Sequence, residues 1–155
     1  MILAYGVAIF FGSMLGNHNP ANPLSLTKLL APKTVSMQNA NTLEELNKLI
    51  ITSAAEGKPV LIYFTADWCV NCQSFKESVL KDQSVMAELA KFSLIEINLT
   101  DTNSPAYSIA AKYGVIGTPE VIFYDANGKL FPARIAGKVS AQTFIDTIIS
   151  VNAAK

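Results

Sequence analysis

The stretch that most limits what this chain can fold into is the apolar run "KPVLIYFTA". It follows a Gly-Lys-Pro break and shows no polar alternation, which is typical of a strand buried on both faces of a sheet. Helical patterns flank this run on both sides. Upstream, Thr42 and Glu45 form a capping box ahead of leucines and isoleucines that share one helical face. Downstream, the segment "SFKESVLKDQSVMAEL" returns to helical spacing.

Strands and helices continue to alternate toward the end of the chain. A second strand, "FSLIEINLT", precedes a helix that Ser104 and Pro105 open as N-cap and first residue, and that Gly114 ends. The segment "PEVIFYDANGKLFPARIAG" predicts a hairpin with a left-handed turn at its Asn-Gly pair. Ser140 then caps a last helix.

This order of elements predicts an α/β fold. Strands that alternate with helices pair in parallel through right-handed crossovers, and the closing hairpin adds an antiparallel edge. We therefore expect a mixed central sheet with helices on both faces. The chain has 155 residues, of which 50% are hydrophobic and 15% charged, with a formal net charge of zero. These values exclude a disordered chain and give no basis for a nucleic-acid partner.

The chain opens with a segment free of charged side chains, "MILAYGVAIFFGSMLG". A bilayer span needs about 20 apolar residues, so this segment is slightly short, and it lacks the basic start and clear cleavage site of a signal peptide. A buried helix is the alternative, but the polar linker that follows favours a membrane anchor or the end of a longer transmembrane helix. We expect an anchor-like segment over residues 1–16, a linker over 17–34 and one domain over 35–155.

The only two cysteines, Cys69 and Cys72, directly follow the buried strand. In the first turn of a helix, free N–H groups and the helix dipole would favour a thiolate at Cys69, and Cys72 could attack a mixed disulfide formed there. A static disulfide is one alternative, but a ring this small stabilises a protein by only about 2 kcal/mol. A zinc site is another, but it would need four ligands and the chain has one histidine. The context favours a redox-active pair.

The motifs around the cysteines resemble the thioredoxin superfamily: "ADWCVNC" after an apolar strand, "GVIGTPEVIFYDANGK" later, and Gly137 before the last helix. Together with "TLEELNKLI", "INLTDTN" and "GKVSAQTFIDTI", they resemble more closely the C-terminal periplasmic domains of the DsbD family of transmembrane thiol:disulfide interchange proteins. The resemblance covers about Val35 to the end. It implies a thioredoxin-like fold, preceded by an apolar segment because in that family the domain follows the last transmembrane helix.

The resemblance also implies roles for individual residues. Cys69 would be the exposed nucleophile and Cys72 the resolving thiol. Pro119 matches the cis-proline that faces the cysteines in these folds, where the backbone of Thr118 is free to hydrogen-bond an extended partner segment. An ordinary proline at the start of a strand is the alternative.

Three residues next to Cys69 are expected to shape the partner-binding surface, namely Trp68, Val70 and Asn71. For Trp68, a plain packing role is the alternative. Val70 and Asn71 bring no positive charge that would strongly stabilise a thiolate, which argues against a powerful oxidase.

Two positions depart from the family pattern. Tyr63 stands six residues before Cys69, where relatives often carry a buried Asp, and Lys76 stands four residues after the second cysteine, where an acidic residue can lie. A nearby carboxylate raises the pKa of a thiol and a lysine lowers it, so we expect Cys69 to be more acidic than in acid-flanked relatives. Proton transfer would fall to water or to Asp67, unless Asp67 is a plain surface residue.

The resemblance implies a protein-disulfide reductase of the bacterial inner membrane, with its thioredoxin-like domain in the periplasm. Electrons would arrive from cysteines of a transmembrane domain and leave to an immunoglobulin-like periplasmic domain, which supplies isomerases and cytochrome c maturation proteins. The disulfide would serve without a further cofactor or a metal ion. Two other functions remain open: a free-standing thioredoxin-like oxidoreductase with its own client proteins, and a thioredoxin-fold binding module whose disulfide never turns over.

Overall fold

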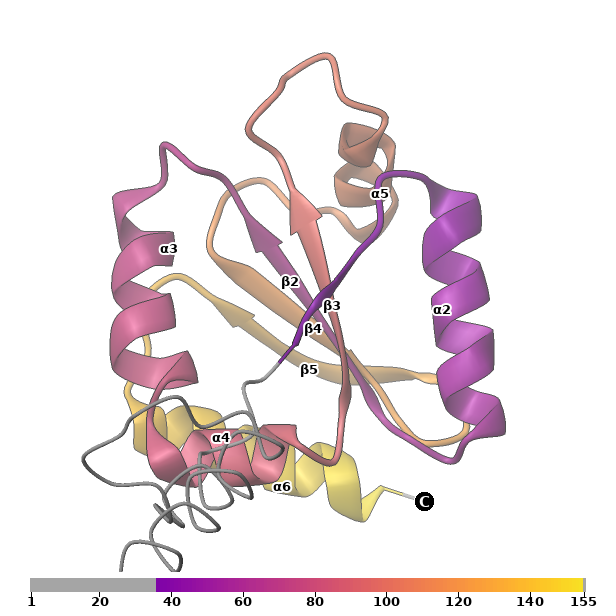
Figure 1. Ribbon diagram of the computed structural model, residues 1–155, viewed down its shortest axis with the longest axis vertical. Coiled ribbons are helices and arrows are strands. Elements are labelled where there is room, and N and C mark those ends of the chain that lie inside the picture. The colour runs from indigo at the N-terminus through magenta and orange to yellow at the C-terminus, as the bar shows by residue number, and fades with distance from the viewer. Residues whose placement is uncertain (1–35, 155) are drawn as a thin grey trace, which may run out of the picture. The chain divides into compact units, whose positions relative to one another are not determined.

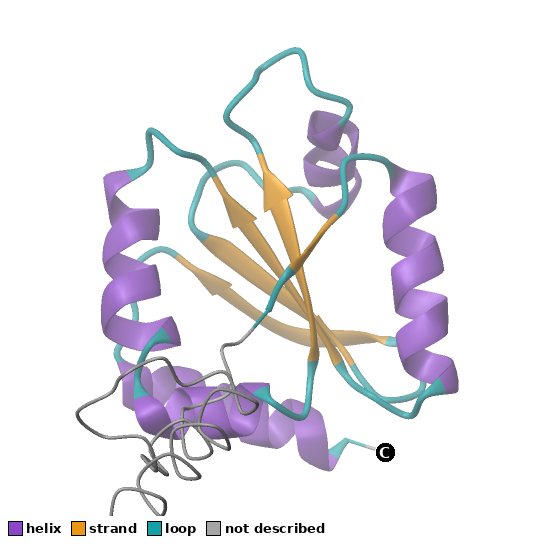
Figure 2. Cartoon of the chain, viewed as in Figure 1, coloured by secondary structure: helices purple, strands orange, loops and turns teal. Residues whose placement is uncertain are grey.

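The computed structural model describes residues 36–154, which form an α/β domain around a five-stranded sheet (Figures 1 and 2). The strand order is β1-β3-β2-β4-β5. β1, β3 and β2 are parallel, whereas β4 runs antiparallel to β2 and β5 antiparallel to β4. The strands are β1 (Gln38–Asn39), β2 (Val60–Thr65), β3 (Ser93–Asn98), β4 (Glu120–Tyr124) and β5 (Leu130–Ala136). The predicted mixed sheet is confirmed.

Helices cover both faces of this sheet, as predicted. They are α2 (Leu43–Ala55), α3 (Val70–Phe75), the π-helical segment η2 (Lys76–Leu80), α4 (Gln83–Leu89), α5 (Ala106–Tyr113) and α6 (Ala141–Ala153). Buried side chains of α2 and α5 pack in one core, and those of α3, η2, α4 and α6 pack in the other. Figure 1 shows α2 and α5 on one side of the sheet and α3 on the other.

Strand β2 forms the centre of the domain. All six of its residues are buried, and it pairs with β3 on one side and β4 on the other. Because side chains alternate across a strand, Tyr63 points into the core beneath α3, whereas Phe64 points into the core beneath α2 and α5. A short loop connects the carboxyl end of this buried strand to Cys69.

Three predicted helix ends are confirmed. The Thr42 side chain accepts the Glu45 N–H at 3.2 Å while the Glu45 carboxylate reaches back to the Thr42 N–H at 3.3 Å, which completes the capping box of α2. Gly114 ends α5 in the left-handed conformation, with φ of +64°. Ser140 caps α6 by accepting the Thr143 N–H.

The structure differs from the sequence predictions at four places. The helix predicted after the cysteines breaks, and α4 restarts with Asp82 as its N-cap. Helix α5 begins at Ala106, one residue later than predicted, although Pro105 already has helical backbone angles. The two-residue strand β1 was not expected. In the β4–β5 turn only Gly128 has a positive φ, so its predecessor in the Asn-Gly pair does not share the left-handed conformation.

The predicted anchor-like segment and linker, residues 1–16 and 17–34, lie outside the described residues. Between residues 36 and 154, no helix is both long and apolar enough to cross a membrane.

Candidate active site

The two cysteines form a disulfide where β2 ends and α3 begins. Cys69 is the N-cap of α3, and its sulfur accepts a hydrogen bond from the Cys72 backbone N–H at 3.1 Å. The Cα atoms of the two cysteines lie 5.2 Å apart. In the reduced protein, the same N–H and the positive end of the helix dipole would stabilise a thiolate at Cys69.

Both cysteines are largely covered. Cys69 is 5% exposed and Cys72 is 1% exposed. The expectation of an exposed Cys69 is therefore wrong for the disulfide state, although Cys69 is the more accessible of the two. The reason is local packing: Cys69 belongs to the same buried cluster as Cys72 and Phe75. Its neighbours Trp68 and Val70, in contrast, are 64% and 75% exposed.

Tyr63 lies on the buried side of the disulfide, in the same core cluster as both cysteines. Its side chain is fully buried, and its hydroxyl donates a hydrogen bond to the Cys72 carbonyl at 3.2 Å. Its ring stacks on Phe75 with 5.6 Å between centroids, and Phe75 meets the edge of Phe144 at 5.4 Å. Burial raises the pKa of Tyr63 above its ordinary value, so the hydroxyl remains a neutral donor at physiological pH.

Lys76, which we expected to act on Cys69 by its charge, has a partner of its own. Its Nζ lies 3.0 Å from a carboxylate oxygen of Glu96 on β3 and 5.6 Å from the centroid of the Tyr63 ring. Glu96 was not singled out in the sequence, because its place beside Tyr63 follows from the register of β2 and β3. Any effect of Lys76 on Cys69 therefore includes the opposing charge of Glu96.

Asp67 is exposed and belongs to a hydrogen-bond network with the end of β3. Its carboxylate accepts from the Asn98 side-chain amide at 3.1 Å, and its backbone N–H donates to the Thr100 hydroxyl at 2.8 Å. These bonds hold the loop between β2 and Cys69. A proton-transfer role for Asp67 stays a prediction.

The Thr118–Pro119 peptide bond is cis, the geometry that the resemblance implies for Pro119. The Pro119 carbonyl accepts a hydrogen bond from the Gly137 N–H at 2.9 Å. The hydroxyl of Thr118 is buried and has no hydrogen-bond partner among the described residues.

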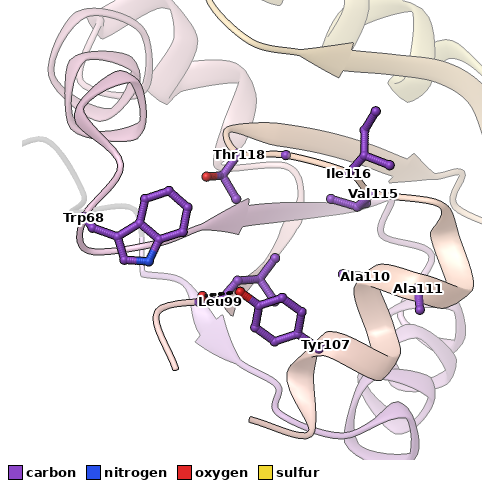
Figure 3. A pocket seen from close by; sticks show the side chains of 9 residues that line it. Trp68, Leu99, Tyr107, Ala110, Ala111, Val115, Ile116 and Thr118 are labelled. Carbon is purple, nitrogen blue, oxygen red and sulfur yellow. Dashed lines mark hydrogen bonds between the residues drawn. The ribbon is translucent and has the colours of Figure 1, made fainter. Parts of the chain in front are cut away.

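Trp68 and Thr118 share the lining of one apolar pocket of about 220 Å³, shown in Figure 3. The other walls come from the end of β3, from α5 and from the loop that follows α5; they are Leu99, Tyr107, Ala110, Ala111, Val115, Ile116 and Gly117. Ile116 is fully exposed at the rim. Sequence reasoning missed Tyr107 and Ile116. An isoleucine between glycines just before Pro119 was the signal that could have identified the rim.

These features define a class of protein. The site of a thioredoxin-like thiol:disulfide oxidoreductase combines three features that are present here. They are a disulfide at the first turn of a helix, a backbone N–H that donates to the more accessible sulfur, and a loop with a cis-proline. The chain belongs to the family of thioredoxin-like domains, because the model of that family matches residues 46–152.

Relatives within this family carry the name of the thiol:disulfide interchange protein DsbD. The chain is 32% identical to DsbD of Campylobacter jejuni over 149 residues and 31% identical to DsbD 1 of Pseudomonas aeruginosa over 147 residues. These alignments cover 96% and 91% of this chain but only 25% of each relative. The chain thus spans about a quarter of their length, and the predicted resemblance to DsbD is confirmed.

Solved structures agree on the fold. The DsbD C-terminal domain of Neisseria meningitidis in its oxidised form matches with a TM-score of 0.64 at 24% identity, covering 76% of this chain and all of that domain. The reduced form of the same domain matches with a TM-score of 0.62 at 25% identity, covering 72% of this chain and 98% of that domain.

Proposed function

We propose that this chain carries the electron-transferring thioredoxin-like domain of a DsbD-type reductase. Cys69 and Cys72 would take two electrons from a transmembrane partner and pass them to an immunoglobulin-like periplasmic partner. The observation that carries this proposal is the Cys72 N–H that points at the Cys69 sulfur from the first turn of α3. That geometry favours a thiolate at Cys69, the group that begins disulfide exchange.

The proposed exchange has two steps. In the reduced domain, the Cys69 thiolate attacks one sulfur of the partner's disulfide; a mixed disulfide forms and the partner's other sulfur leaves as a thiolate. Cys72 then gives up its proton and attacks the Cys69 sulfur. The Cys69–Cys72 disulfide forms, the partner's second thiolate leaves, and the partner has gained two electrons. Reduction of the Cys69–Cys72 disulfide by the electron donor follows the same steps in reverse.

The location of this exchange is part of the proposal. The alignment with Campylobacter DsbD covers 96% of the chain, so it extends upstream of the thioredoxin-like domain into the apolar segment. This supports a DsbD-type arrangement, in which residues 1–16 attach the chain to the inner membrane and the domain lies in the periplasm. The disulfide would be the only redox group required, and delivery of electrons to cytochrome c maturation would pass through the periplasmic partner.

The reduction potential of the Cys69–Cys72 pair tests the proposal. The purified chain is equilibrated in glutathione or dithiothreitol buffers, and its thiols are trapped and counted. A potential of about −270 mV or somewhat less negative is expected for a reductant that relays electrons. A potential of about −120 mV would make the pair an oxidant and would contradict the proposal.

Trapping the intermediate gives a second test. Cys72→Ser leaves the attacking thiolate but removes the resolving thiol, so a mixed disulfide between Cys69 and a partner protein should accumulate on non-reducing gels. Cys69→Ser is the matched control and should trap nothing, because Cys72 is almost completely buried. Equal trapping by both variants would contradict the assigned order of attack.

A second candidate function is a thioredoxin-fold binding module whose disulfide never turns over. The observation that favours it is the burial of Cys69, which is only 5% exposed. The same titration separates the two functions, because a structural disulfide has a potential below about −300 mV.

A further inference from the structure

Arg134 connects the two ends of the loop that carries the cis-proline. It lies on the edge strand β5 opposite Ile122, on the face of the sheet that α5 covers. Its Nε lies 2.9 Å from a carboxylate oxygen of Glu120 in an ion pair, and its Nη2 donates to the main-chain carbonyl of Tyr113. Tyr113 is the last residue of α5 and Glu120 is the first residue of β4. One guanidinium group therefore holds the residues on either side of the loop 114–119.

Glu120 is an unusual residue to find at this position. It is 4% exposed, and burial raises the pKa of its carboxyl group while the Arg134 charge opposes that rise. The Arg134 side chain is 42% exposed, so only the carboxylate end of this ion pair is buried. Such a pair contributes little net stability compared with apolar packing, and its better-attested use is to impose one geometry. Arg134 suits that use, because its planar fork can donate in two fixed directions at once.

The loop held in this way faces the proposed partner. Ile116 is fully exposed, and Thr118 and Ile116 line the pocket beside Trp68 (Figure 3). Gly137, the residue after β5, adds a second contact, since its N–H donates to the Pro119 carbonyl at 2.9 Å. The position of the cis-proline loop is thus set from the edge strand as well as from α5.

We propose that Arg134, oriented by Glu120, is a positioning residue that fixes the loop 114–119 for partner binding. It does so by contacting both ends of the loop, through the ion pair with Glu120 and the hydrogen bond to the Tyr113 carbonyl, so that the Thr118 backbone is aligned before an extended partner segment arrives. The proposal deepens the proposed function and rests on it, because it presumes a protein partner at this site. It predicts that the geometry of these two contacts, and not the charge alone, carries the effect.

Arg134→Lys and Arg134→Met test this prediction in the full chain. Lysine keeps the charge but lacks the planar fork whose two nitrogens face the two acceptors, so both variants should behave alike. The rate of insulin disulfide reduction should fall about tenfold more than the rate with hydroxyethyl disulfide, a small neutral substrate that needs no loop, because slight misplacement of a binding group has large kinetic costs. Lys91→Met is the matched control, since Lys91 forms a surface ion pair with Glu88 on α4. Wild-type rates in Arg134→Lys, or equal losses with both substrates, would overturn the proposal.

Hydrogen exchange gives a readout that does not depend on redox activity. Backbone amides at 115–118 should exchange about tenfold faster in both Arg134 variants than in Lys91→Met, because the hydrogen bond to the Tyr113 carbonyl and the ion pair with Glu120 are lost. Glu120→Gln keeps an oxygen that can accept from Arg134 and should retain slower exchange than Glu120→Ala. Unchanged exchange in the Arg134 variants would refute the positioning role. A chain that reduces neither substrate but shows the exchange difference would refute the proposed function alone.

Discussion

Replacing Tyr63 with phenylalanine removes one hydroxyl group from the buried side of the redox helix and little else. The hydroxyl donates to the Cys72 carbonyl at 3.2 Å. The ring contact with Phe75 and the position of the Lys76 ammonium group over the ring do not depend on the hydroxyl. The substitution therefore isolates one buried hydrogen bond next to the disulfide.

The expected cost is about 1 kcal/mol of unfolding free energy. A buried acceptor left without a donor would raise this cost, but the Cys72 carbonyl also accepts the Lys76 backbone N–H and stays partly satisfied. The cavity left by one oxygen atom is small, since the aromatic ring remains in place. Both considerations keep the cost in the ordinary range for a neutral hydrogen bond.

The pH dependence of this cost follows from the raised pKa of Tyr63. Burial lifts the pKa above the ordinary value of 10.0. A group whose pKa is raised on folding contributes stability that is complete below its unfolded pKa and is lost as pH rises through the folded value. The difference between wild type and Tyr63→Phe should therefore stay constant up to about pH 9 and shrink only in more alkaline solution.

Urea unfolding of the oxidised chain at several pH values measures this difference. Tyr107→Phe is the matched control, because the Tyr107 hydroxyl donates to the Leu99 carbonyl at 3.0 Å, away from the redox helix. A cost for Tyr63→Phe that changed between about pH 6 and about pH 9 would refute the neutral-donor role. A cost above about 3 kcal/mol would show that the hydroxyl supports more than one acceptor.

Three further substitutions test the fold around the site by urea unfolding. Phe144→Ala should lower the unfolding free energy by about 3–5 kcal/mol, because it leaves a buried cavity where the Phe144 ring meets Phe75. A loss below about 1 kcal/mol would contradict that packing. Gly114→Ala should cost about 1 kcal/mol through its positive φ alone, since a Cβ there meets nothing within 4 Å, and a neutral result would argue against the left-handed turn. Asp82→Ala should destabilise α4 near neutral pH. Hydrogen bonds from Ser84 and from the Val85 backbone N–H lower the pKa of Asp82. The difference in unfolding free energy from wild type should therefore disappear once the pH falls below that lowered pKa. A difference that persists there would contradict the N-cap role of Asp82.

The parts of the fold that the sequence predicts are those whose signals are local. The buried strand β2, the Thr42 capping box and the left-handed Gly114 each depend on neighbouring residues, and all three are present. The helix break at Asp82 was missed because helical spacing continues on both sides of it. An Asp before a short helical run was a usable signal for that break.

The parts of the site that the sequence does not predict depend on the register of the sheet. Glu96 reaches Lys76 only because β3 pairs beside β2, and Arg134 reaches Glu120 only because β5 pairs beside β4. The burial of Cys69 is also a tertiary effect, since it comes from packing within the cluster beneath α3. Composition and spacing carry no information about such pairs.

The two edges of the sheet in residues 36–154 limit how other chains can approach. Strand β1 is only two residues long. Strand β5 contains Pro132, which has no N–H, and its register with β4 shifts between Ile122 and Phe123. Neither edge offers a long ladder of free backbone groups, so amyloid-like stacking and sheet extension by a second copy are disfavoured. An extended segment from another chain is therefore left with the ends of the strands, and the disulfide lies at the carboxyl end of β2.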